Sequence, residues 1–294
     1  MNDVPHTESR NPRTNALDRL ATPELVELLA REQNEAVSAV VAVSRELAAA
    51  VDEISLRLRS GGVLHYVGAG SSGRLGFLDA SEMPPTFGTE PALVCAHIAG
   101  GRDALTRAIE GAEDDGDAGG REMRDHVRPG DAVVGLSASG GAAFVVRAIE
   151  TAREIGAWTL GVANNPGSPL AGAAGLAIVL QTGPEPLTGS TRLKAGTAQK
   201  ILLNTLSTAT MVRLGKVYDN LMVDVVATNN KLRKRALRLV MQLVPADAEK
   251  AAKLLQSASG RVKTAVVMGR RDVTCQEARA LLEAHGGSLR RALE

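Results

Sequence analysis

Short apolar runs that alternate with stretches of helical character constrain this chain more than any other feature. The runs have five or six residues each and lie at 63–67, 93–98, 132–136, 159–163 and 176–180. Helical patterns between them predict helices at about 74–81, 102–112 and 142–156. Strands that alternate with helices form a parallel sheet covered on both faces. The sequence therefore predicts an α/β layered fold with a central parallel sheet flanked by helices.

Segments of other character flank this core. Residues 1–21 are polar and contain two prolines, so we expect an extended arm. Thr22 is a candidate N-cap with Pro23 behind it, and apolar residues recur at helical spacing from Val37 to Leu58. This pattern predicts a long amphipathic helix that ends at Gly61.

The C-terminal part of the chain has only helical patterns. We expect one long helix at 192–214, a basic helical run at 231–238, and short helices at 247–257, 261–268 and 274–284 before a final turn. The predicted organisation is an arm with helices packed on the core at 1–60, the α/β domain at 61–240, and a small all-helical domain at 241–294.

Composition excludes several classes of protein. The chain has 294 residues with 34 Lys and Arg against 33 Asp and Glu, and this net charge of +1 gives no field for nucleic acid or a membrane. Six aromatic residues are too few for a base-stacking platform. Cys95 and Cys275 are far apart, no signal peptide pattern opens the chain, and no uncharged run approaches about 18 residues. We therefore expect a cytoplasmic protein without a disulfide framework.

A loop rich in glycine and serine follows the first predicted strand and opens a helix. Gly70, Ser71, Ser72 and Gly73 would offer backbone N–H groups, a helix N-terminus and two hydroxyls to an anion. The spacing is that of a dinucleotide loop, but no clear acidic residue follows about 20 residues later. A sugar-phosphate loop is favoured, and a nucleotide loop or a plain tight turn stays open.

Two further segments of this kind follow later strands. Ser137, Ser139 and Gly140 come after the third strand, and loops at the carboxyl ends of parallel strands converge on one crevice. Ser190 and Thr191 precede Lys194 at the start of the long helix, with Arg192 between them. These hydroxyls, cations and helix N-terminus favour an anion clamp, against the alternative of helix capping and solvated bases.

Two glutamates are candidates for acid–base chemistry. Glu82 precedes Met83-Pro84-Pro85, so we expect its helix to stop there and the negative end of the helix dipole to favour the protonated carboxyl that a general acid needs. Glu113 lies in an acidic turn at 111–117, which lacks the order of an EF-hand. For both residues a solvated surface carboxylate is the alternative.

The five histidines have no paired spacing, so the sequence predicts no metal site. His65 and His97 lie in predicted strands and are expected in the core. His285 precedes Gly286-Gly287 and could reach a site across a subunit boundary.

Three long stretches resemble the N-acetylmuramic acid 6-phosphate etherase family: 68–87 (GAGSSGRLGFLDASEMPPTF), 183–200 (GPEPLTGSTRLKAGTAQK) and 220–229 (NLMVDVVATN). The arm at 7–12 (TESRNP) and the tail at 285–293 (HGGSLRRAL) resemble the ends of the same family. The resemblance implies a sugar-isomerase (SIS) domain that binds a sugar phosphate, a small helical C-terminal domain, and a homodimer with the site near the subunit interface.

The resemblance also implies an activity. The family cleaves the lactyl ether of its sugar phosphate with water during recycling of cell-wall sugars, and needs neither a metal nor an organic cofactor. By motif, Glu82 matches the proton-donor glutamate and Glu113 the second catalytic glutamate. We expect Glu82 to protonate the departing lactate and Glu113 to act as the base, although the sequence does not decide which residue abstracts the C2 proton.

One stretch departs from the family pattern. Where the family usually has Ser-Gly-Arg-Thr-Pro-Tyr, this chain has SGGAAF at 139–144, which removes an arginine and a hydroxyl. Substrate affinity is where we expect an effect. Two other functions remain open on the same fold: a non-catalytic sugar-phosphate sensor, which would act on a partner, and a sugar-phosphate isomerase. Retention of both glutamates favours catalysis.

Overall fold

The computed structural model describes residues 5–224 and 230–294. The chain divides into two compact units, the first made of Met1–Ala80 with Ala92–Ser207 and the second of Ser81–Pro91 with Thr208–Glu294. These divisions fall at other positions than the predicted boundaries after residues 60 and 240, which stay a prediction. The last five residues of the family-like stretch 220–229 lie outside the described residues.

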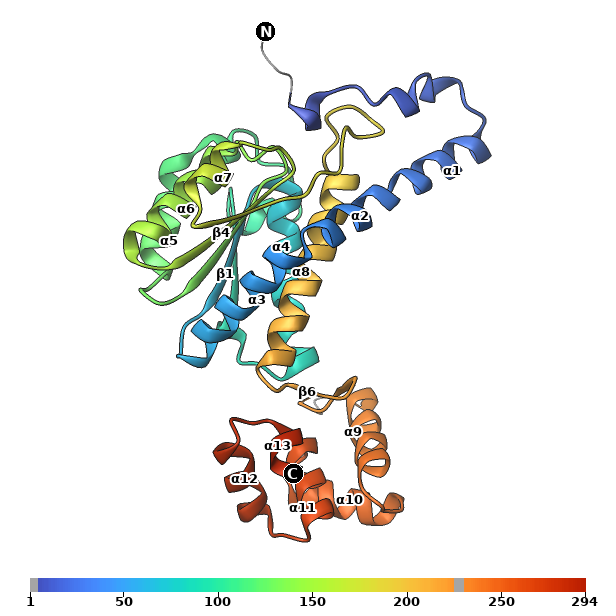
Figure 1. The fold of residues 1–294 in the computed structure, drawn as a ribbon, viewed down its shortest axis with the longest axis vertical. Coiled ribbons are helices and arrows are strands. Elements are labelled where there is room, and N and C mark those ends of the chain that lie inside the picture. The colour runs from blue at the N-terminus through green and yellow to red at the C-terminus, as the bar shows by residue number, and fades with distance from the viewer. Residues whose placement is uncertain (1–4, 225–229) are drawn as a thin grey trace. The chain divides into compact units, whose positions relative to one another are not determined.

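A five-stranded parallel sheet forms the centre of the first unit (Figure 1). Its strands are β1 (Leu64–Gly68), β2 (Val94–Ile98), β3 (Ala132–Leu136), β4 (Trp158–Ala163) and β5 (Leu176–Val179). All five predicted strands are confirmed. They lie in the order β2-β1-β3-β4-β5, with Leu64 of β1 in register with Val94 of β2 and Ala132 of β3.

Helices cover both faces of the sheet, as the alternation predicted (Figure 1). One face carries α5 (Gly116–His126), α6 (Ala143–Ile155) and α7 (Pro169–Ala173); the other carries α3 (Ser44–Arg59), α4 (Gly70–Phe87) and α8 (Lys194–Arg213). Successive strand residues point to opposite faces, so Val67 packs in the core of α5 and α6 while Tyr66 donates a hydrogen bond to Asp79 of α4 over 2.9 Å.

The N-terminal segment differs from its prediction. The expected long helix is three consecutive helices, α1 (Thr22–Glu32), α2 (Asn34–Ala42) and α3, and Ala21 rather than Thr22 occupies the N-cap of α1. The arm forms three short 3-10 turns, η1 (His6–Glu8), η2 (Pro12–Thr14) and η3 (Leu17–Arg19). Its polar side chains Thr7, Asn11 and Thr14 are buried. The Thr7 hydroxyl accepts from Asn165, and Asn11 and Thr14 donate to the carbonyls of Pro184 and Pro186.

The helix that contains Glu82 was predicted to stop at that residue, and this prediction is wrong. Helix α4 begins at Gly70 and continues to Phe87, with Pro84 and Pro85 inside it. Proline nitrogens cannot donate the hydrogen bond to the carbonyl four residues earlier, but both prolines lie in the last turn, so only the end of the helix loses bonds and the helix stops soon after them, at Phe87. Glu82 therefore lies within a helix, and the dipole argument for its protonated form loses its premise.

The helix expected at 102–112 is also wrong. This segment holds two short 3-10 turns, η5 (Arg102–Leu105) and η6 (Ala112–Asp114). Its carbonyls at Ala104, Leu105 and Arg107 accept hydrogen bonds from the guanidinium of Arg74 instead of from a following helical turn. The helix lies further on, as α5, where Asp115 caps the N-terminus by accepting from the Ala118 N–H over 2.8 Å.

The second unit is mainly helical. The short turn η4 (Pro91–Leu93) has Pro91 in this unit and its other residues in the first. The second unit also contains a hairpin of β6 (Val217–Tyr218) and β7 (Leu221–Met222). Its helices are α9 (Asn230–Leu243), α10 (Ala248–Ser257), α11 (Val262–Arg271), α12 (Cys275–Ala284) and α13 (Leu289–Leu293). These helices confirm the predicted C-terminal patterns. Val240 and Val266 belong to their common apolar core, and Thr274 with Glu277 forms a capping box at α12.

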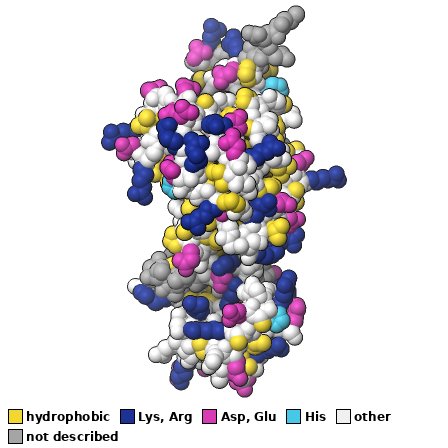
Figure 2. Space-filling view, turned by 90° about the vertical axis from the view of Figure 1, so that its left-hand side faces the viewer, with side chains coloured by type: hydrophobic (Ala, Val, Ile, Leu, Met, Phe, Trp, Pro, Cys, Tyr) yellow, Lys and Arg dark blue, Asp and Glu magenta, His cyan; other side chains and the backbone are white. Residues whose placement is uncertain are grey.

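The described helices include none with the length and apolar character required to cross a lipid bilayer. Figure 2 shows basic and acidic side chains interspersed over the face it presents, which agrees with the net charge of +1.

Candidate functional site

The two predicted anion loops lie at the same edge of the sheet. β1 and β3 are neighbours, and the order of strands reverses direction between them. Ligands of open α/β sheets bind outside the carboxyl ends of the strands at such a switch point. The loops after β1 and after β3 therefore flank the position that this topology favours for a ligand.

Glycines bring the first loop close to the sheet. A Cβ on Gly68 would lie 2.6 Å from the Gly73 nitrogen, and one on Gly73 would lie 2.6 Å from Ile98, so the turn from β1 into α4 has no room for side chains. Gly70 has a φ of +53° and open space beside it. Ser71 is exposed, whereas the hydroxyl of buried Ser72 donates to Gln199 over 2.7 Å. Ser71 and Gly70 are thus accessible members of this loop.

The second loop is held by its own serines. The Ser137 hydroxyl accepts from the Gly140 N–H over 3.1 Å, and the Ser139 hydroxyl accepts from the Gly141 N–H over 3.2 Å. Gly140 has a φ of +71°, and a Cβ there would lie 2.3 Å from the Ser168 hydroxyl. Ser137 is buried and Ser139 is exposed, so Ser139 is the hydroxyl of this loop that a ligand can reach.

A buried chain of amides behind the loops was missed by sequence reasoning. Gln199 of α8 accepts from Ser72 and donates to Asn164 over 3.3 Å. Asn164, at the end of β4, donates to Thr182 over 3.2 Å. No glycine or serine motif accompanies these three residues, so the sequence did not indicate a role for them. They come together only in the folded chain.

The start of α8 is arranged differently from the predicted clamp. Ser190 and Thr191 are half-buried in the turn before the helix, but the ammonium of Lys194 is fully buried 2.9 Å from the Glu32 carboxylate. The helix N-terminus already has an anion, because buried Glu185 accepts from the N–H groups of Lys194 and Ala195 at 2.9 Å each. Burial raises the pKa of Glu185. Lys194 is therefore paired with a protein carboxylate, and its assignment to the anion clamp stays a prediction.

Two hollows of the first unit adjoin these loops. One, of about 460 Å³, lies between α4 and α8; its lining includes Ser71, Arg192 and Lys200. The other, of about 670 Å³, includes Ser139, Asn165 and His6 of the arm in its lining. The first hollow combines a hydroxyl with two exposed cations, which is the chemistry of an anion site. Lys200 was not singled out by its sequence pattern.

The two candidate catalytic carboxylates are both exposed. Glu82 lies on α4 in the stretch Ser81–Pro91, which belongs to the second unit, whereas Glu113 lies on the 3-10 turn η6 of the first. Gly111, with a φ of +74°, leads into that turn. Exposure leaves both carboxylates free to meet a solute.

The stretch that departs from the family pattern forms the N-terminus of α6. Ala142 occupies the N-cap and provides no side-chain hydrogen bond, where the family pattern has a threonine that could cap the helix. Gly141 is exposed, and a Cβ there would meet only the Ser139 hydroxyl at 3.8 Å. An arginine would thus have space at this position, beside the loop after β3.

His65 and His97 are buried, as predicted for core residues. His285 follows α12 in the second unit, and its expected reach across a subunit boundary stays a prediction.

Two family models match parts of this chain. The glucokinase regulatory protein N-terminal SIS domain matches residues 46–153, and the SIS domain matches residues 114–209. Among curated proteins, N-acetylmuramic acid 6-phosphate etherase of Deinococcus radiodurans is 50% identical over 100% of this chain and 96% of its own length. The etherase of the same name from Symbiobacterium thermophilum is 51% identical over 89% of this chain and 87% of its own.

Solved structures share the fold. A phosphoheptose isomerase from Francisella tularensis has a TM-score of 0.55 at 14% identity, covering 66% of this chain and 100% of its own. A putative phosphosugar isomerase involved in capsule formation from Bacteroides fragilis has a TM-score of 0.52 at 19% identity, covering 68% of this chain and 95% of its own. At these identities the likeness concerns the fold, and it confirms the predicted sugar-isomerase architecture.

Proposed function

Because this chain belongs to the N-acetylmuramic acid 6-phosphate etherase family, we propose that it cleaves the D-lactyl ether of N-acetylmuramic acid 6-phosphate with water. The products are N-acetylglucosamine 6-phosphate and D-lactate, and the reaction serves the recycling of cell-wall amino sugars. The observation that carries this proposal is the 50% identity to a named etherase over the whole length of the chain.

The proposed chemistry is that of a carbon–oxygen lyase. An ether resists direct hydrolysis, but opening of the sugar ring creates an aldehyde at C1, which acidifies the proton at C2. A base then removes this proton, and lactate leaves from C3 with its bonding electrons and takes a proton from an acid. Water adds to C3 of the unsaturated intermediate while C2 regains a proton, so the same two groups act in opposite senses.

We assign the acid to Glu82 and the base to Glu113. Support comes from the family motifs around both residues and from the exposure of both carboxylates. The phosphate of the substrate is assigned to the loops after β1 and β3, with Gly70, Ser71 and Ser139 as accessible groups. Arg192 and Lys200 supply positive charge beside Ser71.

Isotopes test the elimination route. In deuterated, oxygen-18 water the product N-acetylglucosamine 6-phosphate should carry deuterium at C2 and oxygen-18 in the C3 hydroxyl. Mass spectrometry and NMR locate both labels. Oxygen-18 in lactate would instead mean attack on the lactyl carbon, and the elimination route would be wrong.

Glu82→Gln and Glu113→Gln test the assigned groups. Each should lower kcat by about 10²- to 10⁴-fold, the usual contribution of general acid–base catalysis. Glu90→Gln and Glu110→Gln are matched controls, because both are exposed glutamates close in sequence to the tested ones. They should keep the wild-type rate of lactate release.

Exchange at C2 separates the two roles. If Glu113 is the base, Glu113→Gln loses deuterium exchange of the substrate together with lactate release. Glu82→Gln should lose lactate release but retain some exchange. The opposite pattern would interchange the roles, and a fully active Glu82→Gln variant would remove Glu82 from the mechanism.

The match to the glucokinase regulatory protein domain favours a second candidate, a sugar-phosphate sensor that acts on a protein partner. Lactate production decides between the two. Tight binding of the sugar phosphate with no lactate released would favour the sensor.

We also propose that the chain acts in the cytoplasm as a homodimer, with the site near the subunit interface. Support for a dimer comes from exposed apolar residues along α1 and α2, which include Val26, Val37 and Val41.

A further inference from the structure

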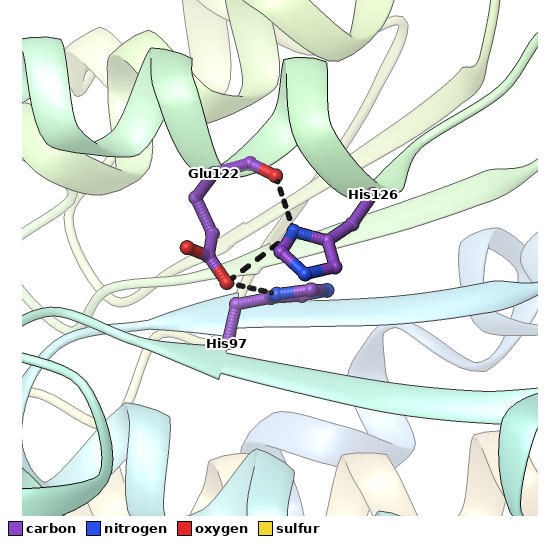
Figure 3. A group of neighbouring side chains, drawn as sticks. All are labelled: His97, Glu122 and His126. Carbon is purple, nitrogen blue, oxygen red and sulfur yellow. Dashed lines mark hydrogen bonds and ion pairs between the residues drawn. The ribbon is translucent and has the colours of Figure 1, made fainter.

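Three histidines that the proposed reaction does not use lie together beside the edge strand β2. His65 lies on β1, His97 on β2 and His126 on α5. His97 and His126 line a cavity of about 880 Å³, together with Glu122 one helical turn before His126. Figure 3 shows Glu122, His126 and His97 pointing toward one another.

The candidate ligand atoms of His97, Glu122 and His126 lie close together. Each of the three offers one ligand atom, and all of these atoms lie within 4.8 Å of one another. The Nδ1 atom of His97 is 2.8 Å from Oε1 of Glu122, and the His126 ring lies beside the same oxygen, with its Nδ1 atom 3.6 Å away. His97 is buried, whereas the side chains of Glu122 and His126 are 38% and 52% exposed, so an ion can enter from solvent.

Hydrogen bonds behind His97 determine which of its nitrogens faces the cluster with a lone pair. His65 is buried, and its ring stacks on that of His97 with the two ring centroids 5.3 Å apart. Its Nε2 faces Oδ2 of Asp131 at 3.5 Å, which favours the proton at that nitrogen. The Nδ1 atom of His65 then accepts from the Nε2–H of His97 over 3.0 Å.

This chain of donors leaves the Nδ1 lone pair of His97 directed at the Glu122 carboxylate. Two acceptors at 2.8 Å repel each other unless a cation lies with them. The Nδ1–H of His126 donates to the backbone carbonyl of Glu122 over 2.9 Å, so its Nε2 also presents a lone pair. A backbone carbonyl behind a ligating histidine, as the Glu122 carbonyl is behind His126, is a usual arrangement that fixes the tautomer at metal centres.

We propose that His97, Glu122 and His126 bind a divalent transition-metal ion, of which Zn²⁺ fits the donor set best. Two imidazoles and one carboxylate are a common set of three protein ligands for zinc, with the fourth position left open, here toward the cavity. Mg²⁺ and Ca²⁺ prefer oxygen ligands and fit less well. Zn–N and Zn–O bonds of about 2.0–2.2 Å place ligand atoms about 3.4 Å apart, which a small movement of the exposed Glu122 side chain allows.

The site would join the edge strand β2 to α5. Neither element contributes Ser71, Ser139, Glu82 or Glu113, so the proposal does not depend on the proposed etherase activity. The sequence signal for it was the spacing of Glu122 and His126 by four residues, which places both on one face of a helix. It went unused because no helix was predicted there.

Calorimetric titration of the full chain with Zn²⁺ tests the proposal, after removal of bound metal by a chelator and in a buffer without phosphate. We expect one ion per chain. His126→Ala and Glu122→Gln should each weaken binding by about 100-fold or more, because loss of a ligand should exceed the 10- to 100-fold effect of losing an outer partner. Both residues are partly exposed, so circular dichroism should show both variants folded. His285→Ala, a histidine outside the cluster, should bind as the wild type does.

Several outcomes would overturn the proposal. No uptake of Zn²⁺ by the wild type would leave a proton as the cation between His97 and Glu122. Equal weakening by His285→Ala and His126→Ala would mean adventitious binding. Co²⁺ provides a second readout: visible absorption without a thiolate charge-transfer band supports the three ligands, whereas a thiolate band would assign the ion to a cysteine.

Discussion

Glu32 shows how a single buried charge can hold several segments together. Its carboxylate, at the end of α1, accepts from Asn11 at 2.8 Å and from Arg13 at 2.6 Å, both on the arm. It also accepts from Lys194 of α8 at 2.9 Å. Sequence reasoning assigned Lys194 to the substrate, because a lysine after a Ser/Thr turn has the same pattern whether its partner is a phosphate or a buried carboxylate.

Glu32→Gln should destabilise the protein by about 3–5 kcal/mol, since the fully buried Lys194 ammonium would lose its partner charge. Urea denaturation measures the change. Combining Glu32→Gln with Lys194→Met removes both charges and should restore most of the stability. A single Glu32→Gln variant as stable as the wild type would mean that Lys194 is solvated by other groups.

The same residue predicts a dependence of stability on pH. Hydrogen bonds from Arg13, with further ones from Lys194 and Asn11, lower the pKa of Glu32 from 4.5 to about 2. Between these values the unfolded chain binds the proton and the folded chain does not, so the contribution is complete above about pH 4.5 and is lost as the pH falls toward 2. The difference in unfolding free energy between wild type and Glu32→Gln should therefore shrink over this range. A constant difference would contradict the lowered pKa.

At the scale of elements, strands were predicted better than the helices between them. Five apolar runs gave five strands, because burial on both faces leaves an unbroken apolar signature. Helix α5 was missed because Gly116, Gly119 and Gly120 disfavour a helix by local propensity. The segment at 102–112 was predicted as a helix because its pattern cannot show that Arg74 occupies its carbonyls.

The candidate site was predictable to a similar degree. The glycine and serine loops come directly after β1 and β3, so their positions followed from the predicted strands. Which hydroxyls are accessible did not follow, because Ser72 and Ser137 are satisfied by partners distant in sequence or by their own turn. Buried partners such as Gln199 and Asn164 become visible only when the chain is folded.

The glycines of α5 make a sharp prediction about helix packing. A Cβ on Gly119 would lie 2.0 Å from the Phe144 carbonyl oxygen of α6, whereas one on Gly120 would meet the Thr151 hydroxyl at 3.2 Å. Gly119→Ala should therefore cost about 1–3 kcal/mol or more through overpacking. Gly120→Ala, the adjacent control, should be near neutral, because the higher helix propensity of alanine offsets a mild contact.

Thermal or urea unfolding compares the two variants directly. Equal stability of Gly119→Ala and Gly120→Ala would contradict the close approach of α5 and α6. A decrease confined to Gly119→Ala would explain why a helix with three glycines is retained here despite its propensity.

At the scale of the whole molecule, the arm extends the first unit beyond its sheet. Thr7 donates its N–H to Asn165 over 3.1 Å, and Asn165 in turn donates to the Ser139 carbonyl over 3.1 Å. Thr14 donates to the carbonyl of Pro186 over 2.9 Å. Through Asn165, Thr7 is thus linked to the loop after β3, and Thr14 contacts the segment before α8, so these residues of the arm help to shape the candidate site.

Exposed apolar side chains on the N-terminal helices lead to the prediction about assembly. Val37 and Val41 lie on one face of α2, with 52% and 67% of their surfaces exposed. A homodimer that buries this face would remove both side chains from water, which stabilises the dimer by about 25 cal/mol per Å² of apolar surface buried.

Replacing both valines with aspartate places two charges on this face. The double variant Val37→Asp with Val41→Asp should therefore be a monomer, with reduced turnover if the site lies near the interface. Multi-angle light scattering measures the mass, and Val212→Asp, at an apolar residue that is 48% exposed on α8, is the matched control expected to stay dimeric. A dimeric double variant would place the interface elsewhere, and a wild-type chain that is monomeric at micromolar concentration would contradict the dimer itself.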